Sequence, residues 1–175
     1  SIAGNGQSGY SGDGGPATNA AVDLISALSV APNGTVYVAG FSGAKGNTIR
    51  RVDTNGYIWH VAGTGTGWGG DGGPATNAAF NSIRGLAVGP DGSLYICDQD
   101  NYRVRRVGTN GIINTVAGTG VSSYSGDGGP ATNAALTTPH GIAVARDGTL
   151  YIADRGNHRI LRVGPDGIIR TLAGK

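Results

Sequence analysis

The chain has 175 residues, of which 38% are hydrophobic and 14% are charged, and its formal net charge is +2. A charge this small does not by itself indicate a nucleic-acid-binding protein, and no apolar run has the length needed to cross a membrane. The 34 glycines are spread among apolar segments. The composition therefore indicates a soluble β protein rich in turns, rather than a disordered chain.

Three near-copies of one phrase divide the chain. The ten residues 12–21, GDGGPATNAA, recur unchanged at 70–79 and at 126–135, and the similarity extends beyond them. A fixed period of this length is typical of repeat architectures. In the third copy, the proline-led segment 130–136 predicts one or two turns of helix on a surface loop, because proline suits the first helical position and alanines favour helix.

Four short apolar runs follow the phrase in each repeat. In the second repeat they are 85–88, 94–98, 103–107 and 112–117, and in the third they are 141–144, 150–154, 159–163 and 168–173. Asp-Gly and Asn-Gly pairs between such runs are a strong hairpin signal. Each repeat is therefore predicted to form an antiparallel meander of four strands.

Meanders in tandem predict an all-β fold, a β-propeller with three blades in one chain. A β-solenoid is the alternative, but solenoids use shorter repeats without internal Asn-Gly hairpins. We expect residues 1–175 to form a single half-propeller. Its blades are expected at about 26–63, 84–118 and 140–174, and its inter-blade loops at 4–25, 63–83 and 118–139.

Two motifs carry a resemblance to a known family. Residues 98–104, DQDNYRV, and 154–160, DRGNHRI, together with the flanking phrases GIAV and LYIAD, resemble the signature of NHL-repeat propellers. The resemblance covers essentially the whole chain. It implies a six-bladed propeller and functions from protein adhesion to RNA binding, with enzymes among related propellers. The fold does not choose among these functions.

The two ends of the chain have similar sequences. Residues 1–5 align with 60–64 and with 171–175, so the chain holds three periods and a short overlap. Three blades cannot close a ring, and they leave both end faces open. We therefore expect a homodimer that closes a six-bladed ring. The alternative is a piece of a longer or engineered chain.

Each long loop places an aromatic residue three positions before an aspartate. An aromatic face beside a carboxylate suits a sugar ring, because the face stacks against C–H groups and the carboxylate accepts hydrogen bonds from hydroxyls. The alternative is that the ring packs over the short helix while the aspartate ties down the glycine-rich turn. The candidate ligand-binding pairs are Tyr10 with Asp13, Trp68 with Asp71, and Tyr124 with Asp127.

An aspartate and an arginine recur at the second hairpin of the later repeats. Asp98 with Arg103, and Asp154 with Arg159, are predicted to form ion pairs across this hairpin, since an arginine fork pairs well with a carboxylate. Because they recur at a scaffold position, we interpret these pairs as structural.

The first repeat departs from this pattern. Gly40 and Thr48 replace the pair, and the loop between them is three residues longer. It brings in Phe41 and Lys45, which become candidate ligand contacts because loops on rigid scaffolds often carry function.

Candidate catalytic and metal-binding residues are not evident. The three histidines do not recur at metal-ligand spacing, and no Ser/His/Asp arrangement is legible, so no cofactor is assigned. Cys97 is expected to be a small buried residue without a disulfide partner. We interpret the chain as a non-catalytic, multivalent recognition module, with a glycan as the preferred ligand and a secreted or extracellular location. The alternatives are an adhesion or engineered scaffold that binds protein, and an enzyme that uses the central channel.

Overall fold

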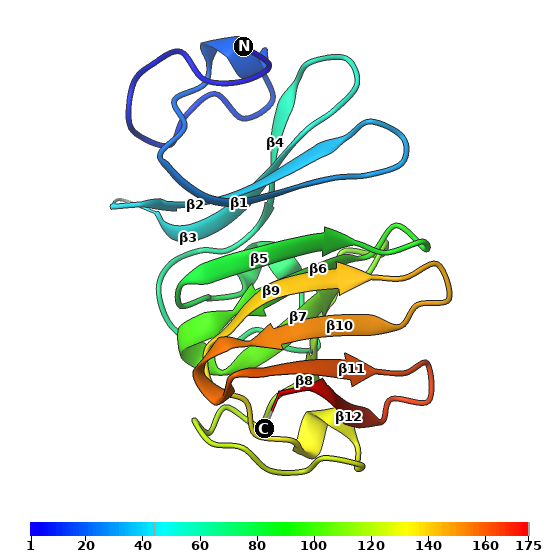
Figure 1. Cartoon of the computed structure of the whole chain (residues 1–175). Coiled ribbons are helices and arrows are strands. Elements are labelled where there is room, and N and C mark those ends of the chain that lie inside the picture. The colour runs from blue at the N-terminus through cyan, green and yellow to red at the C-terminus, as the bar shows by residue number, and fades with distance from the viewer. Residues whose placement is uncertain (44, 175) are drawn as a thin grey trace.

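A computed structural model describes residues 1–43 and 45–174 and contains three four-stranded sheets (Figure 1). The first sheet consists of β1 (Leu24–Val30), β2 (Val36–Ser42), β3 (Gly46–Val52) and β4 (Ile58–Ala62). The second consists of β5 (Ile83–Val88), β6 (Leu94–Asp98), β7 (Arg103–Val107) and β8 (Ile113–Ala117). The third consists of β9 (Pro139–Val144), β10 (Leu150–Asp154), β11 (Arg159–Val163) and β12 (Ile169–Ala173). Each sheet is an antiparallel meander in chain order, which confirms the predicted all-β fold with four strands in each repeat.

Asx-Gly sequences form the tight hairpins, as predicted. Asp91 and Asp147 each accept a hydrogen bond of 3.0 Å from the backbone N–H two residues further along. The glycines that follow them, Gly92 and Gly148, have φ values of 82° and 85°. This left-handed conformation is open to glycine without steric cost, so the sequence determines where these strands reverse.

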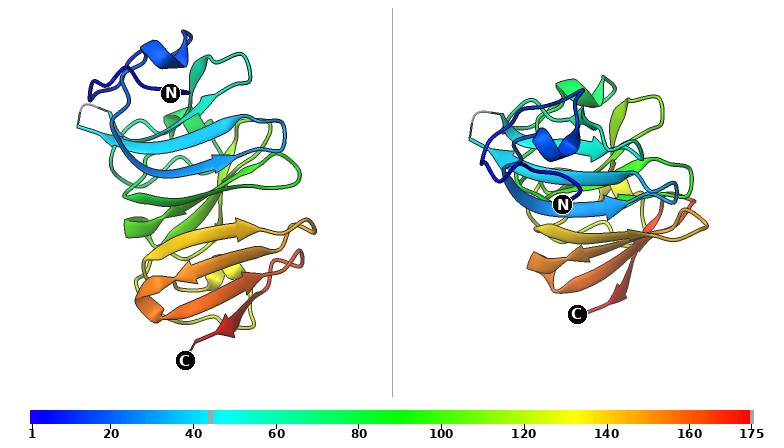
Figure 2. Two further views of the ribbon diagram at one scale, coloured as in Figure 1. Left: turned by 45° about the horizontal axis from the view of Figure 1, so that its top comes forward. Right: turned by 90° about the horizontal axis from the view of Figure 1, so that it is seen from above.

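The three sheets are stacked in chain order, from the N-terminal to the C-terminal end of the molecule (Figure 2). Strands β1, β5 and β9 lie next to one another and form a common edge. Side chains on one face of each sheet interdigitate with those on the opposite face of the next sheet. In the first interface these include Ala39, Ile49 and Ala62 against Phe80, Ile96 and Ile113. In the second they include Cys97, Val104 and Ala117 against Leu136, Ile152 and Ile169.

The long loops cover the outer edge of the sheet that follows them. The backbone N–H of Gly14 donates to Ile58 O, and Ile58 N–H donates back to Gly15 O. The second loop makes the same contacts with Ile113, and the third with Ile169. Backbone groups at an outer strand would otherwise be free to pair with another chain. The loops therefore protect β4, β8 and β12.

The predicted helix on each loop is a single 3₁₀ turn: η1 (Ala17–Asn19), η2 (Ala75–Asn77) and η4 (Ala131–Asn133). In each, the first alanine is buried and the preceding proline has a φ near −60°, which suits entry into a helical turn. Two further turns, η3 (Gln99–Asn101) and η5 (Arg155–Asn157), were not predicted and lie in the hairpin after β6 and β10.

Cys97 is buried within the second interface, as expected for a small apolar side chain. Within residues 1–43 and 45–174, none of the helices combines the length and the apolar character that a membrane span requires.

Candidate functional site

An arginine from the following sheet anchors each of the first two aromatic–aspartate loops. Arg105 of β7 is fully buried, and its Nη2 lies 2.7 Å from Asp71 Oδ1. Its guanidinium also donates to the backbone oxygens of Ala79 and Gly69, at 3.1 and 2.9 Å. A single side chain thus joins both arms of the loop, and a planar guanidinium suits several acceptors at once.

The first repeat contains the same anchor. Arg50 of β3 pairs with Asp13 at 2.9 Å and donates to the backbone oxygens of Ala21 and Ser11. The alternative role considered for these aspartates, that of tying down the glycine-rich turn, is therefore observed at Asp13 and Asp71. Each carboxylate nevertheless stays about one third exposed. It can still accept a hydrogen bond from solvent or ligand.

The third repeat replaces the anchor with an apolar residue. Leu161 stands at the position of Arg50 and Arg105, and it is buried. Asp127 instead accepts a hydrogen bond from the backbone N–H of Thr171. The three loops thus share their backbone path but differ in how their carboxylates are held.

Guanidinium groups stack on the aromatic rings of the loops. Arg103 lies 3.7 Å from the ring centre of Trp68, and Arg159 lies 3.9 Å from that of Tyr124. Such cation–π contacts fix the orientation of a ring. Even with Arg103 stacked on it, Trp68 is 47% exposed, whereas Tyr124 is half-buried and its hydroxyl contacts Thr171 Oγ1 at 2.8 Å. Trp68 is therefore the aromatic residue of the three loops that offers the most free surface.

The predicted ion pairs Asp98–Arg103 and Asp154–Arg159 are wrong. Both aspartates are fully buried and accept hydrogen bonds from the loop: Asp98 from Asn81 N–H at 2.8 Å and from Asn101 Nδ2, and Asp154 from Thr137 N–H and Asn157 Nδ2. The arginines turn instead toward the aromatic rings of the preceding loop. These positions are opposite each other in the strand register, but the side chains diverge.

Burial of these carboxyl groups changes their titration. Desolvation raises the pKa of Asp98 to about 6, although the hydrogen bonds from Asn101 and Asn81 oppose this rise. Burial likewise raises the pKa of Asp154. The role of both residues is structural, as predicted. Amide groups hold these carboxylates in place of Arg103 and Arg159. Asp98 also pairs with the buried Arg105, whose Nη1 lies 3.7 Å from Asp98 Oδ2.

The first repeat brings several candidate residues together around Tyr10. The Tyr10 hydroxyl lies 2.7 Å from His60 Nδ1, and Lys45 Nζ lies 5.6 Å from the centre of its ring. Arg50 contacts the same ring at 4.5 Å. Burial, followed by the hydrogen bond with Asp13, raises the pKa of Tyr10, so the phenol stays neutral. Burial also lowers the pKa of His60.

Phe41 lies apart from this group. It is exposed at the end of β2, where it lines a shallow hollow with Leu24, Asn47 and Arg84. Of the eight candidate residues, the structure thus joins Tyr10, Asp13 and Lys45 in one place, and it places the pairs Trp68–Asp71 and Tyr124–Asp127 on separate loops.

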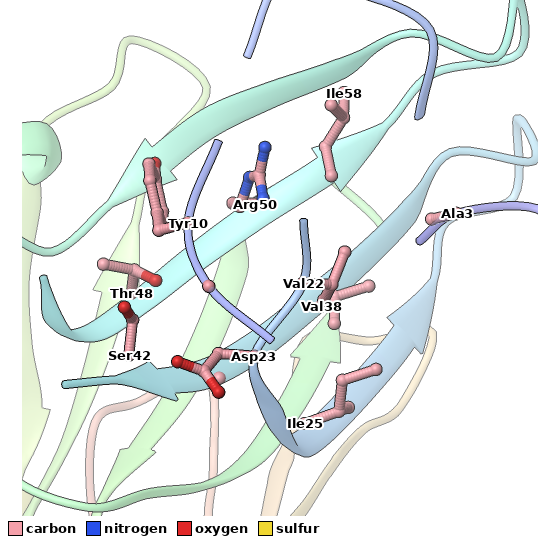
Figure 3. A pocket seen from close by; sticks show the side chains of 12 residues that line it. Ala3, Tyr10, Val22, Asp23, Ile25, Val38, Ser42, Thr48, Arg50 and Ile58 are labelled. Carbon is pink, nitrogen blue, oxygen red and sulfur yellow. The ribbon is translucent and has the colours of Figure 1, made fainter. Parts of the chain in front are cut away.

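A second hollow opens beside Tyr10 on the outer face of the first sheet (Figure 3). One end is apolar and is lined by Ala3, Val22, Val38, Ile25 and Ile58. The other end is polar and holds Asp23, Ser42, Thr48 and Arg50. In the other repeats, the larger and fully buried Phe80 and Leu136 stand at the position of Val22.

Sequence reasoning missed Arg50 and Arg105. The signal was present, because both occupy the position of the apolar Leu161 when the repeats are aligned, which places them on a buried face. A charged residue on such a face requires an acidic partner. In the described part of the chain, no three His, Cys, Asp or Glu side chains gather in a way that could hold a metal ion.

Comparisons with solved structures show the fold of this chain. An auxiliary nutrient binding protein from Bacteroides thetaiotaomicron superimposes with a TM-score of 0.62 at 21% identity, over 83% of this chain and 37% of that chain. A virginiamycin B lyase from Staphylococcus aureus superimposes with a TM-score of 0.53 at 18% identity, over 85% of this chain and 40% of the lyase. At these identities the likeness concerns the fold alone.

Sequence comparisons identify the family. The model of the teneurin NHL domain matches residues 42–108, 66–125 and 114–175. Teneurin-m of Drosophila melanogaster is 35% identical over 163 residues, which cover 85% of this chain and 5% of that protein. Human teneurin-4 is 41% identical over 99 residues, or 49% of this chain, and the chain spans about 4% of its length. With its repeated sheets and its repeated family match, the chain belongs to the teneurin NHL domain family.

Proposed function

We propose that the chain is a non-catalytic recognition module that contacts its ligand through the aromatic–aspartate loops, with a glycan as the preferred ligand class. The observation that carries the proposal is the setting of Trp68. This ring is held in place by Arg103, yet nearly half of its surface is exposed. A ring fixed before binding loses little conformational entropy when a ligand stacks on it.

Polar groups beside Trp68 suit a hydroxyl-rich ligand. Asp71 accepts hydrogen bonds from Arg105 through Oδ1 and from Thr115 Oγ1 through Oδ2. A carboxylate has about four acceptor positions. Because Asp71 is one third exposed, it can accept a further bond from a sugar hydroxyl. The combination of a stacking face and an oriented acceptor supports a sugar-binding role.

The three loops are expected to contribute unequally. Tyr10 and Tyr124 are half-buried, and their hydroxyls contact His60 and Thr171. The Trp68 loop is therefore the principal contact in each chain, and multivalency arises from the number of chains that meet a ligand rather than from three equal sites.

A protein surface is the second candidate ligand. Phe41 and Leu24 are both exposed and line one hollow together with Arg84 and Asp100. Exposed apolar side chains bordered by charges are typical of protein-binding surfaces. An enzyme that uses the central channel has less support, because the likeness to a lyase concerns the fold alone.

Tryptophan fluorescence can test the proposal. The chain has two tryptophans, so Trp59→Phe leaves Trp68 as the single reporter. In this background, glycans selected by an array screen are expected to change the emission in a saturable way. Trp68→Ala removes the fluorescent reporter, so it is tested for binding on the same array, where it is expected to abolish binding. Tyr57→Ala is the control: it removes a ring of comparable exposure from a hairpin, 42% against 47%, and is expected to leave binding intact. Glycan binding that survives Trp68→Ala would contradict the assignment of Trp68 to the binding site. If no glycan on the array bound the chain, the protein-binding alternative would be favoured.

A further inference from the structure

We propose that a groove between the first and second sheets binds a carboxylate group, and that the ligand it fits is a small acidic sugar. The groove lies at the hairpin end of the sheets, where β1 turns into β2 and β5 turns into β6 (right side of Figure 1). The Trp68 ring contacts Arg103 at the start of β7, which is the opposite end of the strands. This inference is therefore independent of the proposed ligand site.

The wall from the first sheet is a row of side chains on neighbouring strands. Tyr37 of β2 is opposite Arg51 of β3, and Arg51 is opposite Trp59 of β4. The guanidinium carbon of Arg51 lies 5.9 Å from the centre of the Trp59 ring. Tyr37 and Arg51 line the groove, and both are half-buried. The cationic group thus stands between two aromatic residues at the edge of the groove.

The wall from the second sheet is formed largely by glycines of its hairpins. Gly92, Gly108 and Gly111 line the groove together with Thr109. A Cβ at Gly111 would meet no atom of the described residues within 4 Å, so the groove is open at this position. Glycines present backbone rather than side chains to the groove, and this leaves room for a ligand between the sheets.

The second repeat shows which group binds the arginine at this position of the sheet. Tyr95 is opposite Arg106 in register, as in the corresponding pair of the first repeat. Arg106 pairs with Asp91 of the preceding turn at 2.7 Å. Desolvation raises the pKa of Asp91, but hydrogen bonds, first among them that from Arg106, outweigh it and lower the pKa to about 2. An ionised carboxylate is thus the partner of this arginine position.

The first repeat has no carboxylate at the position of Asp91. Asn33 takes its place in the turn, whereas the third repeat keeps an acid there as Asp147. The Oδ1 of Asn33 accepts the backbone N–H two residues further along, as Asp91 Oδ1 does, so the turn itself is unchanged. Within residues 1–43 and 45–174, Arg51 forms no ion pair. A half-buried guanidinium without an internal partner favours the binding of an external anion.

Asp53 does not replace the missing acid. Its Oδ1 accepts the backbone N–H groups of Asn55 and Tyr57, and its Oδ2 accepts the indole N–H of Trp59 at 2.8 Å. These hydrogen bonds, that from Tyr57 above all, lower the pKa of Asp53, and the charge of Arg51 adds to the effect. Arg51 thus acts on this carboxylate through its charge rather than through an ion pair.

An acidic sugar suits the chemistry of both walls. A carboxylate and a guanidinium form two parallel hydrogen bonds, which fixes the orientation of the ligand. The hydroxyl groups of Tyr37 and Thr109, which both line the groove, can donate to or accept from the hydroxyls of a sugar. The glycines on the opposite wall leave space for its ring. The carboxylate provides the affinity, and the hydroxyls favour a sugar over a simple organic acid.

Nuclear magnetic resonance of the indole N–H groups tests the inference, because the chain has two tryptophans. Trp59 reports on the groove through Arg51, and Trp68 reports separately on the loop, so a failure of either site is seen by itself. Glucuronate is expected to shift the Trp59 signal in a saturable way. Glucose, which lacks the carboxylate, is expected to leave this signal unchanged. No saturable shift of Trp59, or equal shifts with both sugars, would overturn the proposal.

Removal of the cation tests its role. Arg51→Gln is expected to weaken glucuronate binding about tenfold or more, as for the loss of a hydrogen-bonded charged group. Arg146→Gln is the matched control, because it removes the same charge from an exposed turn of the third sheet. The control is expected to keep the affinity of the unchanged protein. Equal losses in the two variants would show that only the net charge matters and would contradict the groove.

Restoring the internal acid tests where the carboxylate binds. In Asn33→Asp, the new carboxylate is expected to pair with Arg51 as Asp91 pairs with Arg106, and so to block glucuronate while the circular dichroism spectrum stays the same. Asn55→Asp is the control, because it adds the same charge at an exposed position of the next turn. It is expected to weaken binding much less. Unchanged binding to Asn33→Asp, or an equal loss in the control, would contradict the place assigned to the carboxylate.

Discussion

Arg105 offers the sharpest test of how the loops are held. This side chain is fully buried, pairs with Asp71, and donates to the backbone oxygens of Ala79 and Gly69. Two substitutions separate its polar and apolar contributions. Arg105→Ala removes the polar and the apolar contributions, whereas Arg105→Leu keeps an apolar side chain of the type that the third repeat has at Leu161.

The expected magnitude follows from the contacts that are lost. Breaking a buried ion pair by removing one partner costs about 3–5 kcal/mol. The lower end applies to Asp71, because it is one third exposed and water can solvate its carboxylate. The fully buried Asp98, whose Oδ2 lies 3.7 Å from Arg105 Nη1, keeps its hydrogen bonds from Asn81 and Asn101. We therefore expect Arg105→Ala to lower the free energy of unfolding by about 3 kcal/mol. Arg105→Leu keeps the packing against Phe80 and avoids much of the cavity, so we expect a loss of about 2 kcal/mol.

Urea unfolding, followed by circular dichroism, measures both variants. Arg106→Ala is the matched control: Arg106 is the next residue, pairs with Asp91 at 2.7 Å, and is more than one third exposed. Surface pairs of this kind contribute about 1 kcal/mol or less. If Arg105→Ala cost no more than Arg106→Ala, the anchor would not stabilise the loop. If Arg105→Leu cost as much as Arg105→Ala, the packing argument would be wrong.

Two further predictions concern the scaffold. Burial raises the pKa of Asp98 to about 6, so the stability that its protonated carboxyl group contributes is fully present below pH 4. As the pH rises through 6 this contribution is lost, and the free energy of unfolding falls by up to about 3 kcal/mol. Asp98→Asn should flatten this part of the dependence of unfolding free energy on pH, and an unchanged profile would exclude Asp98 as its cause. Gly63 has a φ of 99°, and a Cβ there would meet the backbone oxygen of Asn47. Gly63→Ala should therefore lower the melting temperature markedly, whereas Gly65→Ala, in open space, should not; equal melting temperatures would refute the steric argument.

Local chemistry made the strands predictable. Asx-Gly turns and apolar runs depend on residues close in the sequence, so the hairpins at Asp91 and Asp147 could be placed before the structure was known. The 3₁₀ turns were less accurately predicted, because alanines favour a longer helix than the loop permits. Each turn has only three residues. In the second and third loops the chain that follows it pairs with the first arm of the same loop, Ala79 with Gly69 and Ala135 with Ser125.

Side-chain pairing could not be predicted in the same way. Asp98 and Arg103 are opposite each other in register, and this proximity suggested an ion pair. In the structure Arg103 stacks on Trp68, more than thirty positions earlier in the chain, whereas Asp98 is bound by Asn101 and pairs with Arg105. Which partner a side chain selects depends on how the loop folds back over the sheet, and strand register contains no information about that path.

The first repeat carries its acidic residue at a different position from the later repeats, and its loop is still held by hydrogen bonds. In the later repeats, a buried aspartate at the end of the second strand accepts the N–H of Asn81 or Thr137. In the first repeat that strand position is Gly40, and the acid appears instead in the loop as Asp23, which accepts hydrogen bonds from Ser8 Oγ and its neighbour's N–H. These hydrogen bonds, the one from Ser8 above all, hold the pKa of Asp23 below its usual range. Compared with the later repeats, the first repeat thus has no carboxylate at the end of its second strand and has one, Asp23, at the polar end of the hollow in Figure 3. Unlike Asp98 and Asp154, Asp23 is not fully buried. A hollow with an ionised acid at one end and apolar walls at the other is thus a consequence of this difference together with the smaller Val22.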